Sequence, residues 1–247
     1  MISVVIPTLN SEAGLAATLT SLVPAAVDGL VREAIVVDGG STDRTLEITD
    51  HAGADIVKAE AGRGTQLRAG AARARFPWLL FLHPDTELEA GWEREVSQFI
   101  DRVEAGRRRD TAAVFRFAID DEGATLRLIE GISAVRSRLL KVPYGEQGLL
   151  ISRALYSEVG GYAALPVLED LDLVRKLGRT RITHLRARAV MSPARLQREG
   201  YVKRALRNSA CLTLFMLRVP AARIAQLFGA KTPLGPRSEP LPRSSMP

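Results

Sequence analysis

Asp85 stands at the end of an apolar run, where a carboxylate could do chemistry. Residues 77–86 read PWLLFLHPDT, so five apolar residues are stopped by His83 and Pro84. Such a run predicts a strand buried on both faces, and ligands of open α/β sheets bind beyond the carboxyl ends of such strands. A carboxylate there can hold a hard divalent cation beside a phosphate. The alternative is that Asp85 caps a following helix.

A second carboxylate, Asp38, follows the β-branched stretch 33–37 and precedes Gly39 and Gly40. Glycines let a ligand approach the backbone, and the N-terminus of the helix expected next favours negative charge. Asp38 could accept hydrogen bonds from a base N–H or a sugar hydroxyl, so this segment predicts a nucleotide pocket. It is not a dinucleotide fingerprint, because no G-x-G-x-x-G pattern follows. A plain Asp-Gly turn is the alternative.

A basic, glycine-rich segment lies between these two carboxylates. Gly62 and Arg63 are followed by Gln66 and Arg68 on one predicted helix. Flexible backbone, a permanent cation and an amide placed close together suit the recognition of phosphate or sugar hydroxyls. A surface loop with a solvated arginine is the alternative.

Glu169 and Asp170 are adjacent carboxylates just before a predicted helix, and Asp172 follows two residues later. Adjacent like charges raise each other's pKa, which leaves one group able to take a proton near neutrality. A general base requires that property. Carboxylates also gather at exposed helix N-termini because of the helix dipole, and this is the competing interpretation.

The elements that must position these residues alternate between strand and helix. Strands are predicted at 2–6, 33–37, 54–57, 78–82, 112–117 and 148–151. Helices are predicted at 12–22, 41–52, from 62 onward, at 92–103, 126–140 and 168–174, and from 194 onward. Pro7 is expected to end the first strand. The alternation over residues 1–90 predicts a parallel, doubly wound α/β sheet.

Composition narrows the class of protein. A chain of 247 residues with 46% hydrophobic and 25% charged residues is typical of a soluble globular protein. The single cysteine, Cys211, excludes an internal disulfide and fits a reducing compartment. The N-terminal apolar run is too short for a signal peptide, and no run reaches the roughly 18 apolar residues of a membrane span. We therefore expect a cytoplasmic protein.

Basic residues are concentrated in the last third of the chain. Residues 173–247 hold 16 of the 34 Lys and Arg residues but only two of the 28 Asp and Glu residues. This asymmetry predicts an anionic partner, such as a diphosphate, a lipid surface or nucleic acid, or else a solvated basic face.

The segment 194–229 predicts basic amphipathic helices, and 230–247 is rich in Pro, Ser and Arg and should be a disordered tail. An apolar stripe runs along the helical segment at Val202, Leu206, Ala210, Leu214 and Leu217. It could pack on the rest of the protein or on a second subunit, or rest peripherally on an anionic membrane surface.

Four segments together resemble the family-2 glycosyltransferases of the GT-A fold. They are VVIPTLN at 4–10, VVDGGSTD at 36–43, FLHPD at 81–85 and LEDLD at 168–172. Their order and spacing fit across roughly residues 1–180. The resemblance implies a Rossmann-like, doubly wound, mostly parallel sheet with C-terminal helices. We expect one domain over 1–229, with a nucleotide-binding half at about 1–110 and an acceptor half at about 111–193.

The resemblance also implies roles for individual residues. Asp38 would bind the base of a nucleotide-sugar donor, and Asp85 would hold Mn²⁺ or Mg²⁺ on the diphosphate, with His83 beside it. Asp170 would deprotonate the acceptor hydroxyl next to Glu169. Further donor-binding positions are expected at Pro7, Thr8, Asn10, Gly39, Gly40, Gly62, Arg63, Gln66 and Arg68. The acceptor side is expected at Glu146 and Gln147.

The function expected from this resemblance is metal-dependent, inverting transfer of one sugar from a UDP- or GDP-sugar. The acceptor would be the hydroxyl of a small molecule or lipid, and no nucleic-acid partner is expected. Two departures matter: His83 replaces the first Asp of the D-x-D element, and the Q-x-x-R-W element of processive synthases is absent. The segments around Gly62 and His83 are similar to a small bacterial subgroup, some of whose members are associated with arsenosugar biosynthesis.

Two other functions compete with glycosyl transfer. A sugar-1-phosphate nucleotidylyltransferase shares the broad architecture, but its basic glycine-rich loop would follow the first strand directly, where Pro7 to Asn10 stand here. A non-catalytic protein that binds nucleotide or a membrane partner is the other alternative. The joint presence of Asp38, Asp85 and Asp170 speaks against it.

Overall fold

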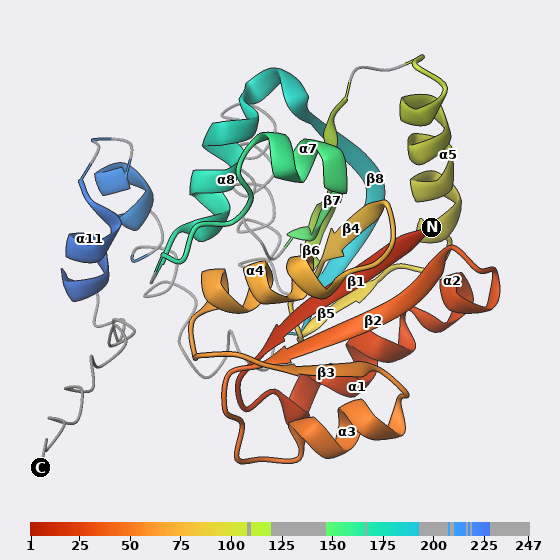
Figure 1. The fold of residues 1–247 in the computed structure, drawn as a ribbon, viewed down its shortest axis with the longest axis horizontal. Coiled ribbons are helices and arrows are strands. Elements are labelled where there is room, and N and C mark those ends of the chain that lie inside the picture. Colours follow the sequence, from red (N-terminus) through yellow and green to blue (C-terminus); the bar gives the residue numbers. More distant parts are fainter. Residues whose placement is uncertain are drawn as a thin grey trace, which may run out of the picture.

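The computed structural model describes residues 1–107, 110–119, 147–165, 167–192, 207, 210–215, 217 and 219–227. Figure 1 shows helices on both faces of one sheet. Within these residues the sheet has eight strands in the order β3-β2-β1-β4-β7-β6-β8-β5. The predicted α/β fold class is confirmed.

Strands and helices alternate along the N-terminal half of the chain. The strands are β1 (Ile2–Thr8), β2 (Val31–Asp38), β3 (Asp55–Lys58), β4 (Trp78–Phe81), β5 (Thr86–Leu88), β6 (Ala112–Ile119), β7 (Leu149–Ser152) and β8 (Ile182–Met191). The helices are α1 (Glu12–Thr20), α2 (Val23–Val27), α3 (Thr45–His51), α4 (Arg63–Arg73), α5 (Trp92–Glu104), α7 (Arg153–Glu158), α8 (Glu169–Leu177) and α11 (Ala221–Leu227), with a 3₁₀ turn η2 (Arg179–Arg181).

The two halves of the sheet differ in strand direction. β3, β2, β1 and β4 are parallel neighbours, as the alternating pattern predicts. β7 then runs antiparallel to both β4 and β6, while β8 is parallel to β6 and antiparallel to β5. The carboxyl ends of the parallel strands therefore share one edge, and the mixed half continues the sheet beside them.

The sheet separates two apolar cores, because alternate side chains of each strand point to opposite faces. Val4 of β1 packs with helices α1, α2 and α5 on one face. Its neighbour Val5 packs with α4, α7 and α8 on the other face. Strands buried on both faces are what the continuous apolar runs predict. Helices α4 and α8 consequently lie on the same side of the sheet (Figure 1).

The expectation that Pro7 ends the first strand is wrong, since β1 continues to Thr8 and Pro7 pairs with Val37. The carbonyl of Val5 accepts a hydrogen bond from Leu82, so Val5 and Pro7 both direct their backbone groups toward β4. β4 pairs with β1 only as far as Val5. Pro7 lies two residues beyond Val5, where β4 no longer pairs with β1, so its missing N–H costs no hydrogen bond between these strands.

Most of the remaining predicted elements are found within two or three residues of their expected bounds. The helices α2 and α7 and the strands β5 and β8 were not predicted. β8 has the sequence ITHLRARAVM, in which polar and basic residues interrupt the apolar ones. It therefore lacks the continuous apolar run by which other strands were predicted. The helix predicted at 126–140 and the tail at 230–247 lie outside the described residues.

Part of the basic C-terminal segment can be placed. Residues 210–215 are helical, and the guanidinium of Arg175 on α8 lies 5.4 Å from the ring centroid of Phe215. After Pro220 the chain restarts as α11, whose Ile224 and Ala225 are buried. In the part of the chain that the structure describes, no helix combines the length and apolar character needed to cross a membrane.

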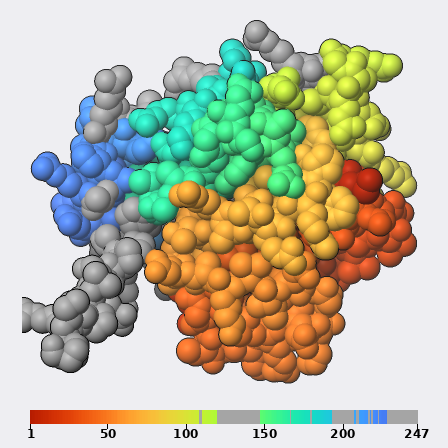
Figure 2. All heavy atoms as spheres, in the orientation of Figure 1, coloured from red at the N-terminus to blue at the C-terminus, as the bar shows by residue number. Residues whose placement is uncertain are grey.

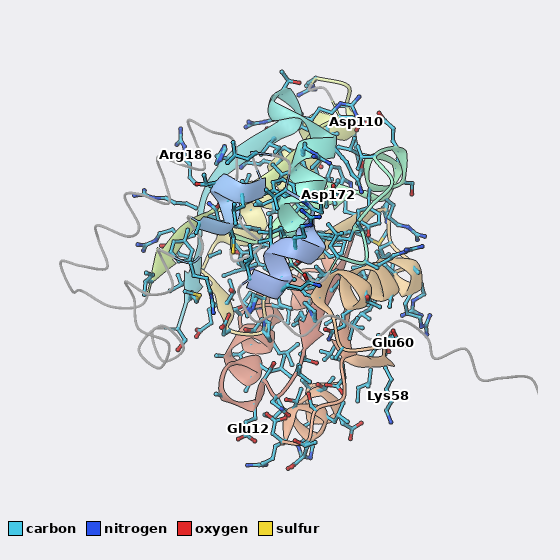
Figure 3. All side chains as sticks on the ribbon, turned by 90° about the vertical axis from the view of Figure 1, so that its left-hand side faces the viewer. Glu12, Lys58, Glu60, Asp110, Asp172 and Arg186 are labelled. Atoms are coloured by element: carbon cyan, nitrogen blue, oxygen red, sulfur yellow. The ribbon has the colours of Figure 1, made fainter. Side chains whose placement is uncertain are left out.

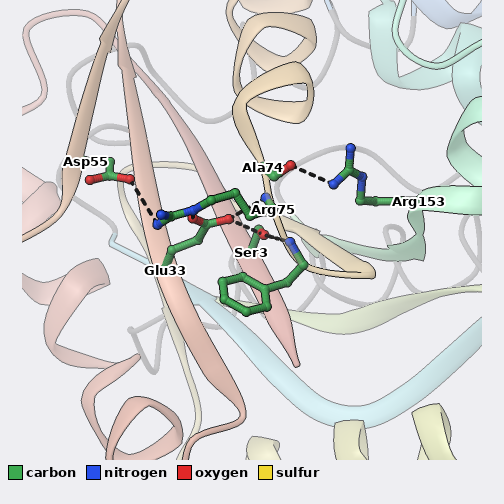
Figure 4. Close-up of polar contacts among 7 residues, drawn as sticks. Ser3, Glu33, Asp55, Ala74, Arg75 and Arg153 are labelled. Atoms are coloured by element: carbon green, nitrogen blue, oxygen red, sulfur yellow. Dashed lines mark hydrogen bonds and ion pairs between the residues drawn. The ribbon is translucent and has the colours of Figure 1, made fainter.

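The amino ends of the strands are joined by a polar network (Figure 4). The buried carboxylate of Glu33 accepts hydrogen bonds from the Ser3 hydroxyl at 2.6 Å and from the Arg75 backbone and guanidinium at 2.7 and 2.6 Å. Arg75 also approaches Asp55 at 3.7 Å. Burial raises the pKa of Glu33, but these hydrogen bonds outweigh it and the pKa is lowered overall. The network ties β1, β2 and β3 to the segment that enters β4.

We predict that Glu33→Gln lowers the free energy of unfolding at pH 7 by about 1–2 kcal/mol, because the hydrogen bonds to a charged acceptor are weakened. A lowered folded-state pKa means that this stabilisation is present above the unfolded value and is lost as pH falls through the folded value. The difference between wild type and variant should therefore shrink from pH 7 to pH 3 in urea titrations. Glu47→Gln, at an exposed pair with Arg44, is the control and should change little. An equal loss at both pH values would contradict the account.

Candidate active site

Asp38 lies where β1 and β2 end side by side, paired in register with Thr8. Its carboxylate accepts hydrogen bonds from the backbone N–H groups of Gly40 and Ser41, both at 2.9 Å, and from the Ser41 hydroxyl at 2.5 Å. The Thr8 hydroxyl donates at 3.3 Å. Burial raises the pKa of Asp38, but the hydrogen bonds together outweigh this effect, and the pKa is lowered overall. The side chain is therefore a fixed anion.

The loops after β1 and β2 are joined to each other. The Asn10 backbone N–H donates to the Ser41 hydroxyl at 2.8 Å, and the Asn10 side-chain oxygen accepts from the Thr42 backbone at 2.8 Å. Asn10 adopts a positive φ of 50°, which asparagine tolerates better than most residues. These bonds fix the shape of the loops around Asp38.

Gln66 connects α4 to the same strand ends. Its amide nitrogen donates to the carbonyls of Thr8 and Val37, both at 2.7 Å, and the side chain is buried. A Cβ at Gly39 would stand 3.2 Å from that amide, so Gly39 allows this close approach. Arg68, two residues further along α4, is exposed. The structure thus places Gln66 beneath the loops and Arg68 at the surface.

His83 and Asp85 face each other on the short connection between β4 and β5. The Nδ1 atom of His83 contacts Oδ1 of Asp85, and both side chains are mostly buried. Gly14 of α1 supports this connection, because a Cβ at Gly14 would lie 2.9 Å from the Asp85 Cα and from the Pro84 carbonyl oxygen. Asp85 does not cap a helix, since β5 begins at the next residue.

Arg63, the first residue of α4, bridges the two adjacent carboxylates of α8. Its Nε lies 3.2 Å from Oε1 of Glu169, and its terminal nitrogen lies 3.2 Å from Oδ2 of Asp170. Arg63 was predicted beside phosphate, and Glu169 and Asp170 were predicted as a proton-accepting pair. The fold therefore brings two predicted groups from segments about one hundred residues apart into one cluster.

The environment of Glu169 makes it titrate near neutrality. Its side chain is 6% exposed, compared with 12% for Asp170. Burial and the neighbouring charge of Asp170 raise the pKa of Glu169 to about 7, although the charge of Arg63 acts in the opposite direction. The guanidinium of Arg63 thus lies beside both the Glu169 and the Asp170 carboxylate.

Tyr162 is a site residue that the sequence analysis missed. Its hydroxyl donates to Oδ1 of Asp170 at 3.2 Å, and its ring packs edge-on against Phe81 of β4, with centroids 4.9 Å apart. Burial and the charge of Asp170 raise the pKa of the Tyr162 phenol well above its usual value, so it remains a neutral donor. The signal was Gly160-Gly161-Tyr162, a turn that ends in an aromatic residue just before the acidic helix.

Two backbone features hold α4 and α8 together. A Cβ at Gly64 would lie only 2.3 Å from the carbonyl oxygen of Ala163, so glycine is required where α4 meets the loop before α8. Leu168, the residue before Glu169, has a left-handed conformation with φ 65°. Such conformations in non-glycine residues cluster at functional sites. Figure 2 shows the surface around α4, in orange, bordering that of α7 and α8, in green to teal.

Asp172 is separate from this cluster. Its carboxylate is paired with Lys176 at 2.8 Å and Arg175 at 3.4 Å, both further along α8. Figure 3 shows Asp172 on α8, well away from Glu12 and Lys58 in the N-terminal part of the molecule. The third carboxylate of the acidic segment therefore forms its ion pairs with basic residues of its own helix.

A small surface cleft reaches the cluster. It is lined by Arg63, Leu67, Phe81, Leu82, Leu149, Tyr162 and Asp170. Asp170 faces this cleft, and Glu169 does not line it.

On the expected acceptor side, Glu146 lies outside the described residues. Gln147 is buried beside β6, where its amide nitrogen donates to the Phe115 carbonyl at 3.2 Å, while its side-chain oxygen has no hydrogen-bond partner among the described residues. Among the residues that can be placed, no group of three or more His, Cys, Asp or Glu side chains is arranged to hold a metal ion.

Comparison with known structures identifies the fold. A glucosyl-3-phosphoglycerate synthase from Mycobacterium tuberculosis, in complex with Mn²⁺ and UDP-glucose, has a TM-score of 0.60 and 23% identity, covering 89% of this chain and 80% of that one. TarS 1–349 of S. aureus, in complex with UDP-GlcNAc, has a TM-score of 0.57 and 20% identity, covering 76% and 58%. The fold is the predicted GT-A fold.

Sequence comparison reaches the same family. An uncharacterized glycosyltransferase of Mycobacterium tuberculosis is 32% identical over 117 residues, 46% of this chain and 51% of the relative. A PGL/p-HBAD biosynthesis glycosyltransferase of the same species is 36% identical over 118 residues, 42% of this chain and 43% of the relative. The chain thus spans about half the length of these relatives. The model of Glycosyl transferase family 2 matches residues 3–165, which include Asp38, Arg63 and Asp85, and the chain belongs to that family.

Proposed function

We propose that this glycosyltransferase moves one sugar from a UDP- or GDP-sugar to an acceptor hydroxyl with inversion at the anomeric carbon. One observation carries the proposal: Arg63, from the nucleotide-binding half, contacts Glu169 and Asp170 at the acceptor half. A cation suited to a diphosphate and a carboxylate suited to a proton thus share one cleft. Solved structures of similar fold hold UDP-glucose with Mn²⁺ and UDP-GlcNAc, which agrees with this chemistry.

Asp38 supports the choice of nucleotide. Its low pKa keeps the carboxylate charged, so it can only accept hydrogen bonds. A base that offers a ring N–H, such as uracil or guanine, can donate to it in place of the long bond from the Thr8 hydroxyl at 3.3 Å, whereas cytosine presents a ring acceptor. Thr8 and Asn10, with Pro7, Gly39 and Gly40, shape the strand ends and loops around it. UDP- and GDP-sugars are therefore the proposed donors.

His83 and Asp85 are the proposed holders of a divalent cation. A carboxylate oxygen and an imidazole nitrogen in mutual contact offer two ligands, and phosphate oxygens and water would complete the coordination. The nitrogen ligand favours Mn²⁺ over Mg²⁺, which prefers oxygen ligands. When bound, such an ion would neutralise charge on the departing nucleoside diphosphate.

Asp170 is the proposed general base. It lines the cleft and is more exposed than Glu169, so an acceptor hydroxyl can reach it. Inversion requires one in-line displacement, in which the acceptor oxygen bonds to the anomeric carbon as the bond to the diphosphate breaks. The acceptor proton passes to Asp170. Glu169 lies beside Asp170 and contributes to the charge of the site through its own protonation state.

Donor turnover tests the proposed function. The protein should slowly hydrolyse a UDP- or GDP-sugar in the presence of Mn²⁺, and less after chelation, because water can replace the missing acceptor. Release of UDP or GDP measured by chromatography checks this. Cleavage of the sugar nucleotide to a nucleoside monophosphate and a sugar 1-phosphate would instead indicate a different reaction, as would release of pyrophosphate from a nucleoside triphosphate and a sugar 1-phosphate.

We predict that Asp85→Ala abolishes the metal-dependent part of donor turnover and leaves the fold intact. The effect of His83→Ala should be milder, because a neutral imidazole is a poorer ligand for hard cations than a carboxylate. Turnover as a function of Mn²⁺ concentration provides the measurement, with circular dichroism as the folding control. An unchanged rate in Asp85→Ala would remove that residue from the site.

Asp170→Asn should reduce transfer by about 10²–10⁴-fold, the scale of general base catalysis, while donor affinity barely changes. Asparagine is nearly isosteric, and its side-chain oxygen can still accept the hydrogen bond from Tyr162. Glu169→Gln is the matched comparison one residue away. If transfer survived in Asp170→Asn and vanished in Glu169→Gln, the two roles would have to be exchanged.

A further inference from the structure

Both oxygens of the Asp170 carboxylate have partners. The Tyr162 hydroxyl donates to Oδ1 at 3.2 Å, and a terminal nitrogen of Arg63 lies 3.2 Å from Oδ2. An acceptor hydroxyl that approaches Oδ2 must therefore compete with the guanidinium of Arg63 for that oxygen. Each carboxylate oxygen can accept more than one hydrogen bond, and movement of Tyr162 or Arg63 would open more of Asp170 to an acceptor hydroxyl.

Tyr162 is the fixed partner. The residue is 3% exposed, and its ring packs against Phe81 and Tyr156 at centroid distances of 4.9 and 6.0 Å. Its backbone N–H donates to the Tyr156 hydroxyl at 3.0 Å. Moving the phenol would disrupt the core between β4 and α7.

Arg63 is the movable partner. Its side chain is 32% exposed, and it extends from the first turn of α4, directly after Gly62. A diphosphate offers a guanidinium a bidentate partner with more negative charge than a single carboxylate. A donor bound above the N-terminus of α4 would therefore compete with Glu169 and Asp170 for Arg63.

Departure of Arg63 would also change the charge balance of α8. Among the residues described by the structure, the charged and titratable groups around Glu169 are Asp170 on the same helix, Arg63 on α4 and Tyr162 in the preceding loop. Asp172 is paired with Lys176 and Arg175. Without Arg63, two adjacent carboxylates would remain in a largely buried position, which is costly unless one of them becomes neutral. The more buried Glu169 is the one expected to take a proton.

We propose that the donor's diphosphate draws Arg63 away from α8, so that the acceptor hydroxyl no longer competes with the guanidinium for Oδ2 of Asp170, and Glu169 takes up a proton from solvent. This inference rests on the proposed function and adds an order of events to it. Donor binding thus makes the base more accessible to the acceptor hydroxyl. In the transfer step the acceptor O–H bond breaks toward Oδ2, the acceptor oxygen bonds to the anomeric carbon, and the electron pair of the broken bond leaves with the nucleoside diphosphate.

Proton uptake on nucleotide binding tests the proposal. UDP and GDP are titrated calorimetrically with Mn²⁺ at pH 7 and pH 8, in buffers of different ionisation enthalpy. At pH 7 a group with a pKa of about 7 is half ionised, so wild type should take up about half a proton more than Glu169→Gln. The difference should grow at pH 8, where more of Glu169 is charged before binding. Subtracting the Glu169→Gln value removes protons exchanged by the nucleotide and the metal.

Arg63→Gln should weaken nucleotide binding and remove most of this uptake, because Glu169 is already protonated when the cation is absent. Arg63→Lys keeps a positive charge and should retain part of the proton uptake. This variant also serves as a second test if Arg63→Gln folds poorly. Arg73→Gln, at an exposed arginine on the last turn of α4, is the matched control and should behave as wild type.

The outcomes separate the two proposals. If neither nucleotide binds, the proposed function fails, and this inference fails with it. If a nucleotide binds with equal proton exchange in wild type and Glu169→Gln, or if Arg63→Gln keeps the full uptake, glycosyl transfer can stand and the release of Arg63 is wrong.

Discussion

The contact of Arg63 with Glu169 and Asp170 is the interaction on which the proposed site depends. Two adjacent carboxylates that are only 6% and 12% exposed need a cation beside them, and α4 supplies it across the surface of the sheet. Breaking a buried ion pair by removing one partner is strongly destabilising, because it leaves charge without compensation. The structure therefore holds α4 and α8 in one relative position.

That position imposes conditions on the chain around it. Gly64 must be glycine, because the Ala163 carbonyl oxygen occupies the space of a side chain, and Leu168 must adopt a left-handed conformation to begin α8. Gln66 fixes the same helix to the ends of β1 and β2. Through α4, the loops around Asp38 and the carboxylates of α8 are thus part of one rigid arrangement.

Local patterns were sufficient to predict much of this arrangement. Apolar runs that stop at Asp38 and Asp85 indicated strands and also the residues that would stand at their ends. The predicted start of a helix near Gly62 and the acidic start of α8 are confirmed as well. These features depend on a few neighbouring residues, so one sequence contains the information.

Features that depend on contacts between distant segments could not be predicted. Nothing near Arg63 in sequence indicates that it meets Glu169. The Gly160-Gly161 turn marks Tyr162 as a residue close to the acidic helix, but it does not indicate that the Tyr162 hydroxyl reaches Asp170. Gln66 has the composition of a ligand-binding residue, yet its amide is hydrogen-bonded to two strand carbonyls. Pro7 continues β1 only because β4 pairs no further than Val5, a fact that belongs to the sheet and not to the residue.

A crystal structure of the protein with UDP and Mn²⁺ tests the central claim most directly, namely that Arg63 belongs to both the donor and the base. The account predicts a diphosphate near the N-terminus of α4, the Arg63 guanidinium hydrogen-bonded to it, and the Tyr162 hydroxyl still on Asp170. A bound diphosphate with Arg63 still paired to both Glu169 and Asp170 would contradict the account.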